Sequence, residues 1–132
     1  EPALPRDRPV VLLDYPALIP TTARPLAGTP WSERWELYVD GVEIANCYTE
    51  QTDPAALAKL VADETLRKRG ARVMPAPDVE LASVFPPGFP LCSGVALGVD
   101  RLEMVLGGEQ SLEGVILFPF SAILRRQSGT MV

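Results

Sequence analysis

The dipeptide Asp40-Gly41 stands between two runs of strand-forming residues, and no other local feature restricts the fold as strongly. Aspartate followed by glycine tolerates positive φ angles at both central positions of a type I′ turn, which matches the twist of two antiparallel strands. The flanking runs extend from Trp31 to Val39 and from Val42 to Glu50. The sequence therefore predicts a β-hairpin and, with it, an antiparallel sheet.

The first run of the hairpin alternates between two sets of side chains, as a strand does when its two faces meet different surroundings. The apolar set predicts a buried face and the other set a wetter face. The apolar set is Trp35, Leu37 and Val39, and the other is Arg34, Glu36 and Tyr38.

Three apolar runs outside the hairpin predict further strands. Val10 to Tyr15 has the continuous apolar character of a strand buried on both faces of a sheet, and Val115 to Phe118 predicts a last buried strand or strand end. Cys92 to Val99 predicts a strand of small residues. Between the first run and the hairpin, residues 16–30 contain four prolines and Gly28 and predict an extended surface loop.

Helix signals follow the hairpin. Asp53 is an N-cap candidate before Pro54, whose missing N–H costs nothing at the first helical position, and this helix is expected to run to about Arg69. A short helix is expected over 78–85, and Asp100 is expected to cap another that stops at a glycine pair. Together the elements predict a single α+β domain over 1–132, an antiparallel β-sheet flanked by helices.

Arg67, Lys68 and Arg69 form a basic group at the end of the first predicted helix. Cations there interact favourably with the negative end of the helix dipole, and Gly70 is suited to close the helix. Helix capping is therefore preferred over RNA binding as the interpretation of this group.

Composition limits the chemistry of the chain. The net charge of −5 argues against a nonspecific grip on a phosphate backbone, and the absence of histidine removes the commonest general base. Cys47 and Cys92 lack the spacing of a disulfide framework or a zinc site. No apolar run approaches the roughly 18 to 20 residues that cross a bilayer, so a cytoplasmic protein with no membrane partner is predicted.

Two carboxylates and an amide occur close together in the second hairpin run. Glu43, Asn46 and Glu50 supply hard oxygens of the kind that Mg²⁺ or an ammonium group requires. Solvated strand carboxylates are the simpler alternative. Positions seven apart fall on opposite faces of a straight strand, so convergence needs an irregularity, predicted between Ala45 and Thr49, or a position of Glu50 beyond the strand end.

Glycines and an arginine mark a second candidate site at residues 94–102. Gly94 and Gly98 would allow a ligand to approach the backbone closely, and Arg101 offers a bidentate fork for phosphate. A glycine-relieved junction between a strand and a helix, with Arg101 paired to its neighbours, explains the same residues equally well.

Three ordered segments resemble one family. Gly98 to Leu102, after a run of small residues, resembles motif 3 of class II aminoacyl-tRNA synthetases, the arginine of which engages ATP. Glu43 to Glu50 resembles the acidic strand that precedes motif 3 in lysyl-tRNA synthetases, and Val115 to Pro119 resembles that subgroup's closing segment. The resemblance covers roughly residues 15–120, and three segments in order are far more specific than any one alone.

Residues 92–98 add a finer resemblance, to the elongation factor P lysine ligase family, which attaches a β-lysyl group to a protein that mimics tRNA. Lysyl-tRNA synthetases usually carry glycine where Ala96 stands. One methyl group there would reshape the amino-acid pocket, a change worth on the order of 1 to 3 kcal/mol in discrimination.

The resemblance implies that lysine or β-lysine is activated with ATP and Mg²⁺ as an aminoacyl-adenylate, without a protein nucleophile. Arg101 is expected to hold ATP in line for displacement. Glu43 and the backbone at Ile44 are expected to lie against ATP, with Glu43 also a candidate Mg²⁺ ligand. Gly98 is expected to let the nucleotide pack against the backbone.

The amino acid is expected to contact a second group of residues. Asn46 would orient it, Glu50 would face its ammonium group or share the metal, and Ala96 would shape its pocket. Arg101, Glu43 and Glu50 are the residues expected to carry catalysis.

The sequence also departs from the family pattern. It shows no motif 1 helix, which normally builds the dimer interface, and no motif 2 pattern of Phe-Arg-x-Glu type. The chain is therefore expected to be the C-terminal part of a catalytic domain that forms a homodimer at full length, and to be inactive alone. Two alternatives stay open: a lysyl-tRNA synthetase that charges tRNA, and a truncated, non-catalytic paralogue that acts as a binding module.

Overall fold

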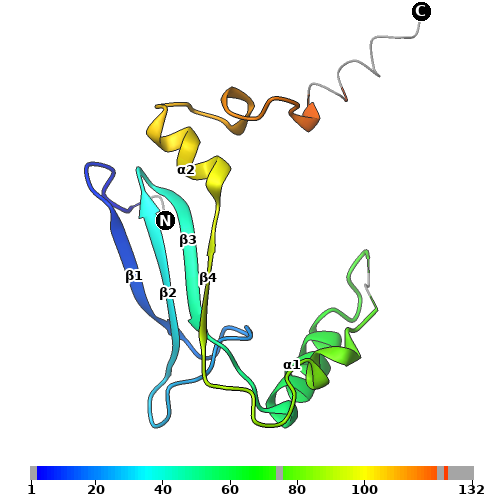
Figure 1. Cartoon of the computed structure of the whole chain (residues 1–132). Coiled ribbons are helices and arrows are strands. Elements are labelled where there is room, and N and C mark those ends of the chain that lie inside the picture. Colours follow the sequence, from blue (N-terminus) through cyan, green and yellow to red (C-terminus); the bar gives the residue numbers. More distant parts are fainter. Residues whose placement is uncertain (1–2, 74–75, 122–123, 125–132) are drawn as a thin grey trace, which may run out of the picture. The chain divides into compact units, whose positions relative to one another are not determined.

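The computed structural model describes residues 3–73, 76–121 and 124. Within them, four strands form one antiparallel sheet in the order β1-β2-β3-β4 (Figure 1). The predicted antiparallel sheet is thereby confirmed. Its strands are β1 (Val10–Pro16), β2 (Trp31–Val39), β3 (Val42–Thr49) and β4 (Ser93–Leu97).

The chain divides into two compact units. Of the described residues, the first unit contains 3–11, 36–45, 96–121 and 124, and the second contains 12–35, 46–73 and 76–95. Each strand contributes residues to both units.

The predicted hairpin is confirmed. Asp40 and Gly41 form its two-residue turn with φ angles of 50° and 73°, the positive values that a type I′ turn requires. A two-residue loop fixes the register of a hairpin, so the residues flanking the turn face each other. One step further from the turn, Tyr38 lies opposite Glu43.

The faces of β2 are the reverse of the prediction. Tyr38 is 2% exposed and Glu36 is 6% exposed, whereas Trp35 and its apolar partners along the strand are only half-buried. The Tyr38 hydroxyl donates a hydrogen bond of 2.6 Å to a Glu36 carboxylate oxygen, which removes much of the cost of burying both groups. Alternation separates the two faces of a strand, but it does not say which face the fold covers.

The first strand is not buried on both faces, so this expectation was wrong. β1 stands at one edge of the sheet, and its Val11 and Leu13 are 51% and 64% exposed. A continuous apolar run reports strand propensity, but the depth of burial depends on neighbours far along the chain.

The predicted last strand is also absent. Residues 115–118 follow a short 3₁₀ helix, η2 (Leu112–Gly114), and are not assigned to a strand. Leu117 is 89% exposed and Phe118 is 82% exposed. Strand structure needs a pairing partner, which the described residues do not supply here.

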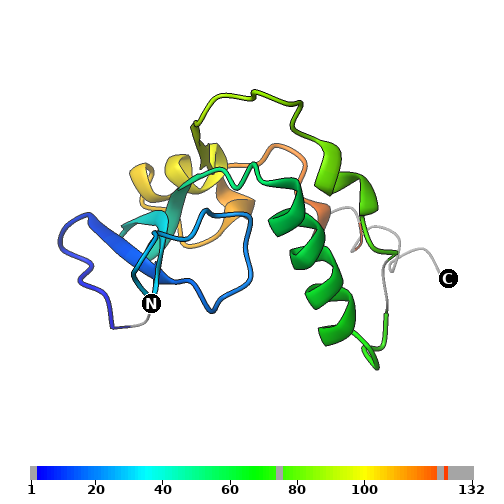
Figure 2. The same ribbon diagram turned by 90° about the horizontal axis from the view of Figure 1, so that it is seen from below.

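The helices agree closely with the prediction. α1 (Pro54–Arg67) begins at its N-cap Asp53, whose side chain accepts a hydrogen bond of 2.9 Å from the backbone N–H of Ala55. The 3₁₀ helix η1 (Val79–Ser83) occupies the predicted short helical segment and packs beside α1 (Figure 2). Neither α-helix of the described residues is long and apolar enough to cross a membrane.

The N-cap of the second helix differs from the prediction. α2 (Val99–Leu106) has Gly98 as its N-cap, and no side chain of the described residues caps it. Asp100 lies in the first turn instead, where a negative charge interacts favourably with the positive end of the helix dipole.

The proline-rich segment 16–30 is largely a loop, as expected, and it belongs to the second unit, where hydrogen bonds hold part of it. Ala23 is 4% exposed and forms an isolated antiparallel bridge with Glu50. The backbone N–H of Arg24 donates to the carbonyl of Thr49 at 2.8 Å. The loop therefore has a fixed course beside the end of β3.

Candidate functional site

In the first unit, Arg101 joins the start of α2 to β3. Its Nη1 atom donates a hydrogen bond of 3.0 Å to the backbone carbonyl of Glu43 and lies 3.4 Å from that residue's Oε2. The backbone N–H of Gly98 donates to the carbonyl of Ile44 at 2.8 Å, and Ile44 is buried. Four of the predicted site residues are thus brought together.

The Arg101–Glu43 pair remains accessible to a ligand. The Arg101 side chain is 50% exposed and that of Glu43 is 32% exposed. The hydrogen bonds that Arg101 makes within the described residues use Nη1. The rest of its guanidinium fork is therefore available to an anionic group such as a phosphate.

Glycine at position 98 is not demanded by the local structure. Its φ angle of −80° is accessible to any residue, and a Cβ atom there would lie 3.4 Å from Cδ of Arg101, which is ordinary contact. Within the described residues, neither backbone strain nor steric conflict therefore explains why residue 98 is a glycine. Close approach of a ligand would explain it.

A buried carboxylate beside this pair was missed in the sequence. Glu36 lies two residues from Tyr38 along β2, and Tyr38 lies opposite Glu43, so all three occupy one face of the hairpin. The signal was present in the spacing, but Glu36 had been assigned to the wetter face. Among the described residues, no group of three or more Asp, Glu, Cys or His side chains could hold a metal ion.

Glu50 and Asn46 belong to the second unit. Glu50 follows the end of β3, and its backbone N–H donates to the carbonyl of Cys92 at 3.0 Å. A Cβ atom on Gly94 would lie 3.3 Å from Oε1 of Glu50, so the carboxylate rests against this glycine. β3 runs unbroken from Val42 to Thr49, without a break at the predicted irregularity, and Glu50 lies beyond the strand end.

Ala96 belongs to the first unit and lies on β4, two residues before Gly98. All five residues of β4 are exposed. The methyl group of Ala96 is therefore open to a ligand, as a residue that shapes a pocket must be.

Comparison with known proteins identifies the family. The family described as tRNA synthetases class II (D, K and N) matches residues 5–122. The chain therefore belongs to this family of ligases, in agreement with the resemblance in its three sequence segments.

Individual relatives fall into two groups. The chain is 39% identical over 124 residues to the elongation factor P–(R)-β-lysine ligase of Klebsiella pneumoniae (strain 342), and 35% identical over 122 residues to that of Vibrio cholerae. It is 34% identical over 121 residues to the lysine–tRNA ligase of Anaeromyxobacter sp. (strain K). These matches cover 89%, 91% and 90% of this chain but 37%, 38% and 24% of the respective relatives. The chain thus spans less than two fifths of the length of each.

Proposed function

We propose that residues 1–132 are the C-terminal part of a class II catalytic domain, with motif 3 at residues 94–102, that activates lysine or β-lysine as an adenylate and passes it to elongation factor P. The observation that carries the proposal is the contact of Arg101 with Glu43. It brings the arginine of the motif 3 segment against the acidic strand, although the two residues are 58 positions apart in sequence.

ATP would be positioned by the first unit. The half-exposed guanidinium of Arg101 would bind phosphate oxygens through the N–H groups that Glu43 does not engage, and Gly98 would leave room for the nucleotide against the backbone. The substrate carboxylate would attack the α-phosphorus and pyrophosphate would leave. The protein residues would contribute orientation and charge stabilisation to this displacement.

The hairpin face also fits Mg²⁺ that arrives with ATP. Glu43 would offer a partly exposed hard carboxylate ligand, and the buried Glu36 carries a second carboxylate on the same face. Mg²⁺ typically takes one or two protein carboxylates and completes its shell with water and substrate phosphates, so a larger protein cluster is not needed. When bound, the ion would neutralise phosphate charge.

The amino acid would be recognised by Asn46, Glu50 and Ala96. The Glu50 carboxylate would pair with the substrate ammonium, and the Asn46 amide would orient the substrate. The Ala96 methyl group would reshape the pocket relative to a glycine by about one carbon. We assign the full-length protein to the cytoplasm and to the homodimeric state of its family by analogy.

A protein acceptor is preferred over tRNA for two reasons. The two elongation factor P ligases are 39% and 35% identical to the chain, compared with 34% for the lysine–tRNA ligase. Ala96 also occupies the position at which lysyl-tRNA synthetases usually carry glycine. The lysine–tRNA ligase match makes charging of tRNA the second candidate. A non-catalytic binding module is the third.

The test places this chain within a full-length relative. Residues 5–122 would replace the matching segment of the Klebsiella ligase, and ATP–pyrophosphate exchange would be measured with lysine and with β-lysine. Transfer of the activated amino acid would then be measured to elongation factor P and to tRNA in parallel.

We expect exchange by the chimera, none by the isolated chain, and transfer to elongation factor P. Transfer to tRNA alone would favour the second candidate. A folded, dimeric chimera without exchange would favour the non-catalytic module. Robust exchange by the isolated chain would refute the proposal that it is part of a site.

A further inference from the structure

Four cations stand within six residues at the C-terminal end of α1. They are a third of the 12 Lys and Arg residues of the chain, and all four are exposed. The chain has a net charge of −5, so without this +4 the remainder has a net charge of −9. The basic cluster, as we call it, consists of Arg67, Lys68, Arg69 and Arg72.

Helix capping accounts for only half of the basic cluster. Arg67 is the last residue of α1 and Lys68 is its C-cap, and both lie within ion-pair distance of Glu64, at 4.0 Å and 3.4 Å. Arg69 and Arg72 come after the helix end, and the favourable effect of the helix dipole is confined to its last turn. Within the described residues, neither makes an ion pair or a side-chain hydrogen bond.

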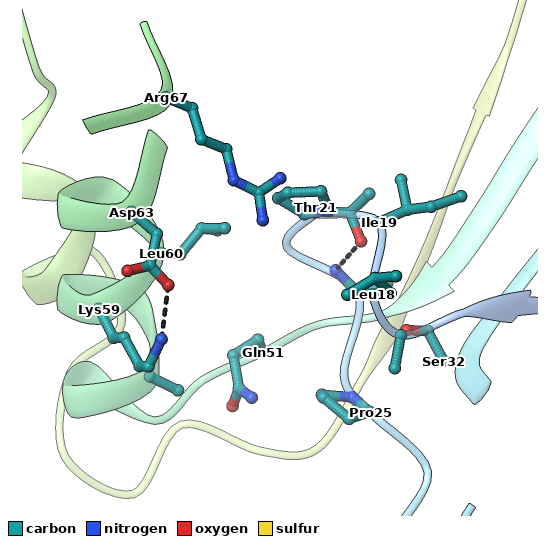
Figure 3. A pocket seen from close by; sticks show the side chains of 14 residues that line it. Leu18, Ile19, Thr21, Pro25, Ser32, Gln51, Lys59, Leu60, Asp63 and Arg67 are labelled. Atoms are coloured by element: carbon teal, nitrogen blue, oxygen red, sulfur yellow. Dashed lines mark hydrogen bonds and ion pairs between the residues drawn. The ribbon is translucent and has the colours of Figure 1, made fainter. Parts of the chain in front are cut away.

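A cleft adjoins the basic cluster within the second unit. It has a volume of about 310 Å³ and lies between α1 and the loop 17–25 (Figure 3). Arg67 reaches from α1 toward Thr21 across one end of it, and Leu60 points into it from the helix. Leu18 and Ile19 add an apolar wall from the loop. The cleft therefore combines apolar walls with a guanidinium at its rim.

The other charges of the cleft compensate each other. Lys59 Nζ and Asp63 Oδ2 are 2.5 Å apart, one turn apart on α1. Arg67, one turn further on, has only the loose 4.0 Å contact with Glu64. A ligand in the cleft therefore meets the weakly paired positive charge of Arg67, which belongs to the basic cluster.

We propose that the basic cluster and this cleft form a docking surface for an acidic segment of the acceptor protein. Carboxylates of that segment pair with Arg69 and Arg72, and an apolar side chain beside them enters the cleft next to Arg67. The inference rests on the proposed function in one respect: it takes the acceptor to be a protein.

Charge and composition favour an acidic protein segment over a nucleic acid. A phosphate backbone presents dense negative charge over a long distance, which the −9 of the remaining chain would repel, whereas a local group of carboxylates meets chiefly the basic cluster. No aromatic residue is present in the basic cluster or among the described residues that line the cleft. Bases would therefore find no stacking platform.

The experiment measures binding of the whole chain to purified elongation factor P by titration calorimetry at low ionic strength, with lysine tRNA as the parallel arm. The test variant is Arg69→Gln with Arg72→Gln. The matched control is Arg6→Gln with Arg8→Gln, which changes the net charge equally at two side chains that are 68% and 69% exposed. Leu18→Ala tests the cleft, and since Leu18 is 86% exposed this change does not threaten the fold.

We expect the test variant to weaken binding to elongation factor P by roughly fivefold or more, and Leu18→Ala to weaken it by about threefold. The control is expected to change affinity by less than about twofold, and added salt to weaken the wild-type complex. A glutamate-rich peptide is expected to compete with elongation factor P.

Three results would overturn the docking surface: no binding of elongation factor P by the wild-type chain, equal binding by the test variant, or binding of tRNA alone that depends on Arg69 and Arg72. The amino-acid activation assay of the chimera separates this failure from failure of the proposed function. Activation without an effect of the two arginines on binding refutes only the docking surface. Binding through the arginines without activation supports the docking surface and contradicts the proposed function.

Discussion

Arginine is used in opposite ways in the two units of this chain. In the first unit, Arg101 bonds both the main chain and the side chain of Glu43, a residue distant in sequence. In the second, Arg69 and Arg72 extend beyond the end of α1 without an ion pair inside the described residues. The arginine of the candidate site is therefore held by a partner far away in the sequence, whereas the two arginines that we assign to a docking surface have no such partner among the described residues.

The largest effect is expected at the internal arginine. Arg101→Ala in the chimera should lower the rate of ATP–pyrophosphate exchange by about a hundred- to a thousandfold, because a preorganised positive charge beside the phosphates is lost. Arg8→Ala serves as the control. A loss of less than about tenfold would remove the contrast between the two classes of arginine.

A smaller effect on stability is expected in the same unit. Tyr38→Phe removes the hydroxyl that donates to the buried Glu36 carboxylate and should lower the free energy of unfolding by about 1 to 2 kcal/mol. Urea denaturation of the chain followed by circular dichroism measures this change. An unchanged midpoint would show that the bond does not stabilise the hairpin face.

The helix that carries the basic cluster should respond more weakly. Asp53→Ala removes the N-cap acceptor of α1 and should lower the free energy of unfolding by about 1 kcal/mol. The same denaturation experiment applies, with Asp53→Asn as the conservative variant that retains a capping oxygen. If alanine and asparagine gave equal stability, the cap would have no energetic role.

The smallest effect on stability is expected at the two arginines beyond the end of α1. Arg69→Gln with Arg72→Gln should change the free energy of unfolding by less than about 0.5 kcal/mol, since exposed charges without a partner contribute little to the fold. A clear loss of stability would mean that the fold depends on these two arginines, and it would contradict their assignment to a docking surface.

Local signals in the sequence predicted the elements that local interactions build. Asp40-Gly41 predicted the hairpin, and Asp53 before Pro54 predicted the start of α1, because turn geometry and helix capping involve residues only a few positions apart. The resemblance placed Arg101 and Glu43 against the same nucleotide, but the direct contact between the two residues was not predicted.

Features that depend on distant neighbours were not predicted. The alternation along β2 did not show that Glu36 and Tyr38 would be the buried pair, and the apolar run at 115–118 did not show that a pairing strand would be absent from the described residues. The cleft beside α1 was missed because the course of loop 17–25 is set by hydrogen bonds to the far end of the hairpin. Whether Glu50 acts together with Glu43 stays a prediction.

The two hydrogen bonds of Arg101 to Glu43 differ in how far they depend on the amino acid at position 43. One of its two bonds ends on a main-chain oxygen, which every amino acid at position 43 would provide. The guanidinium can therefore keep its place while the charge beside it is altered or removed. A substitution at position 43 would therefore change the charge beside Arg101 without removing the main-chain hydrogen bond that positions it.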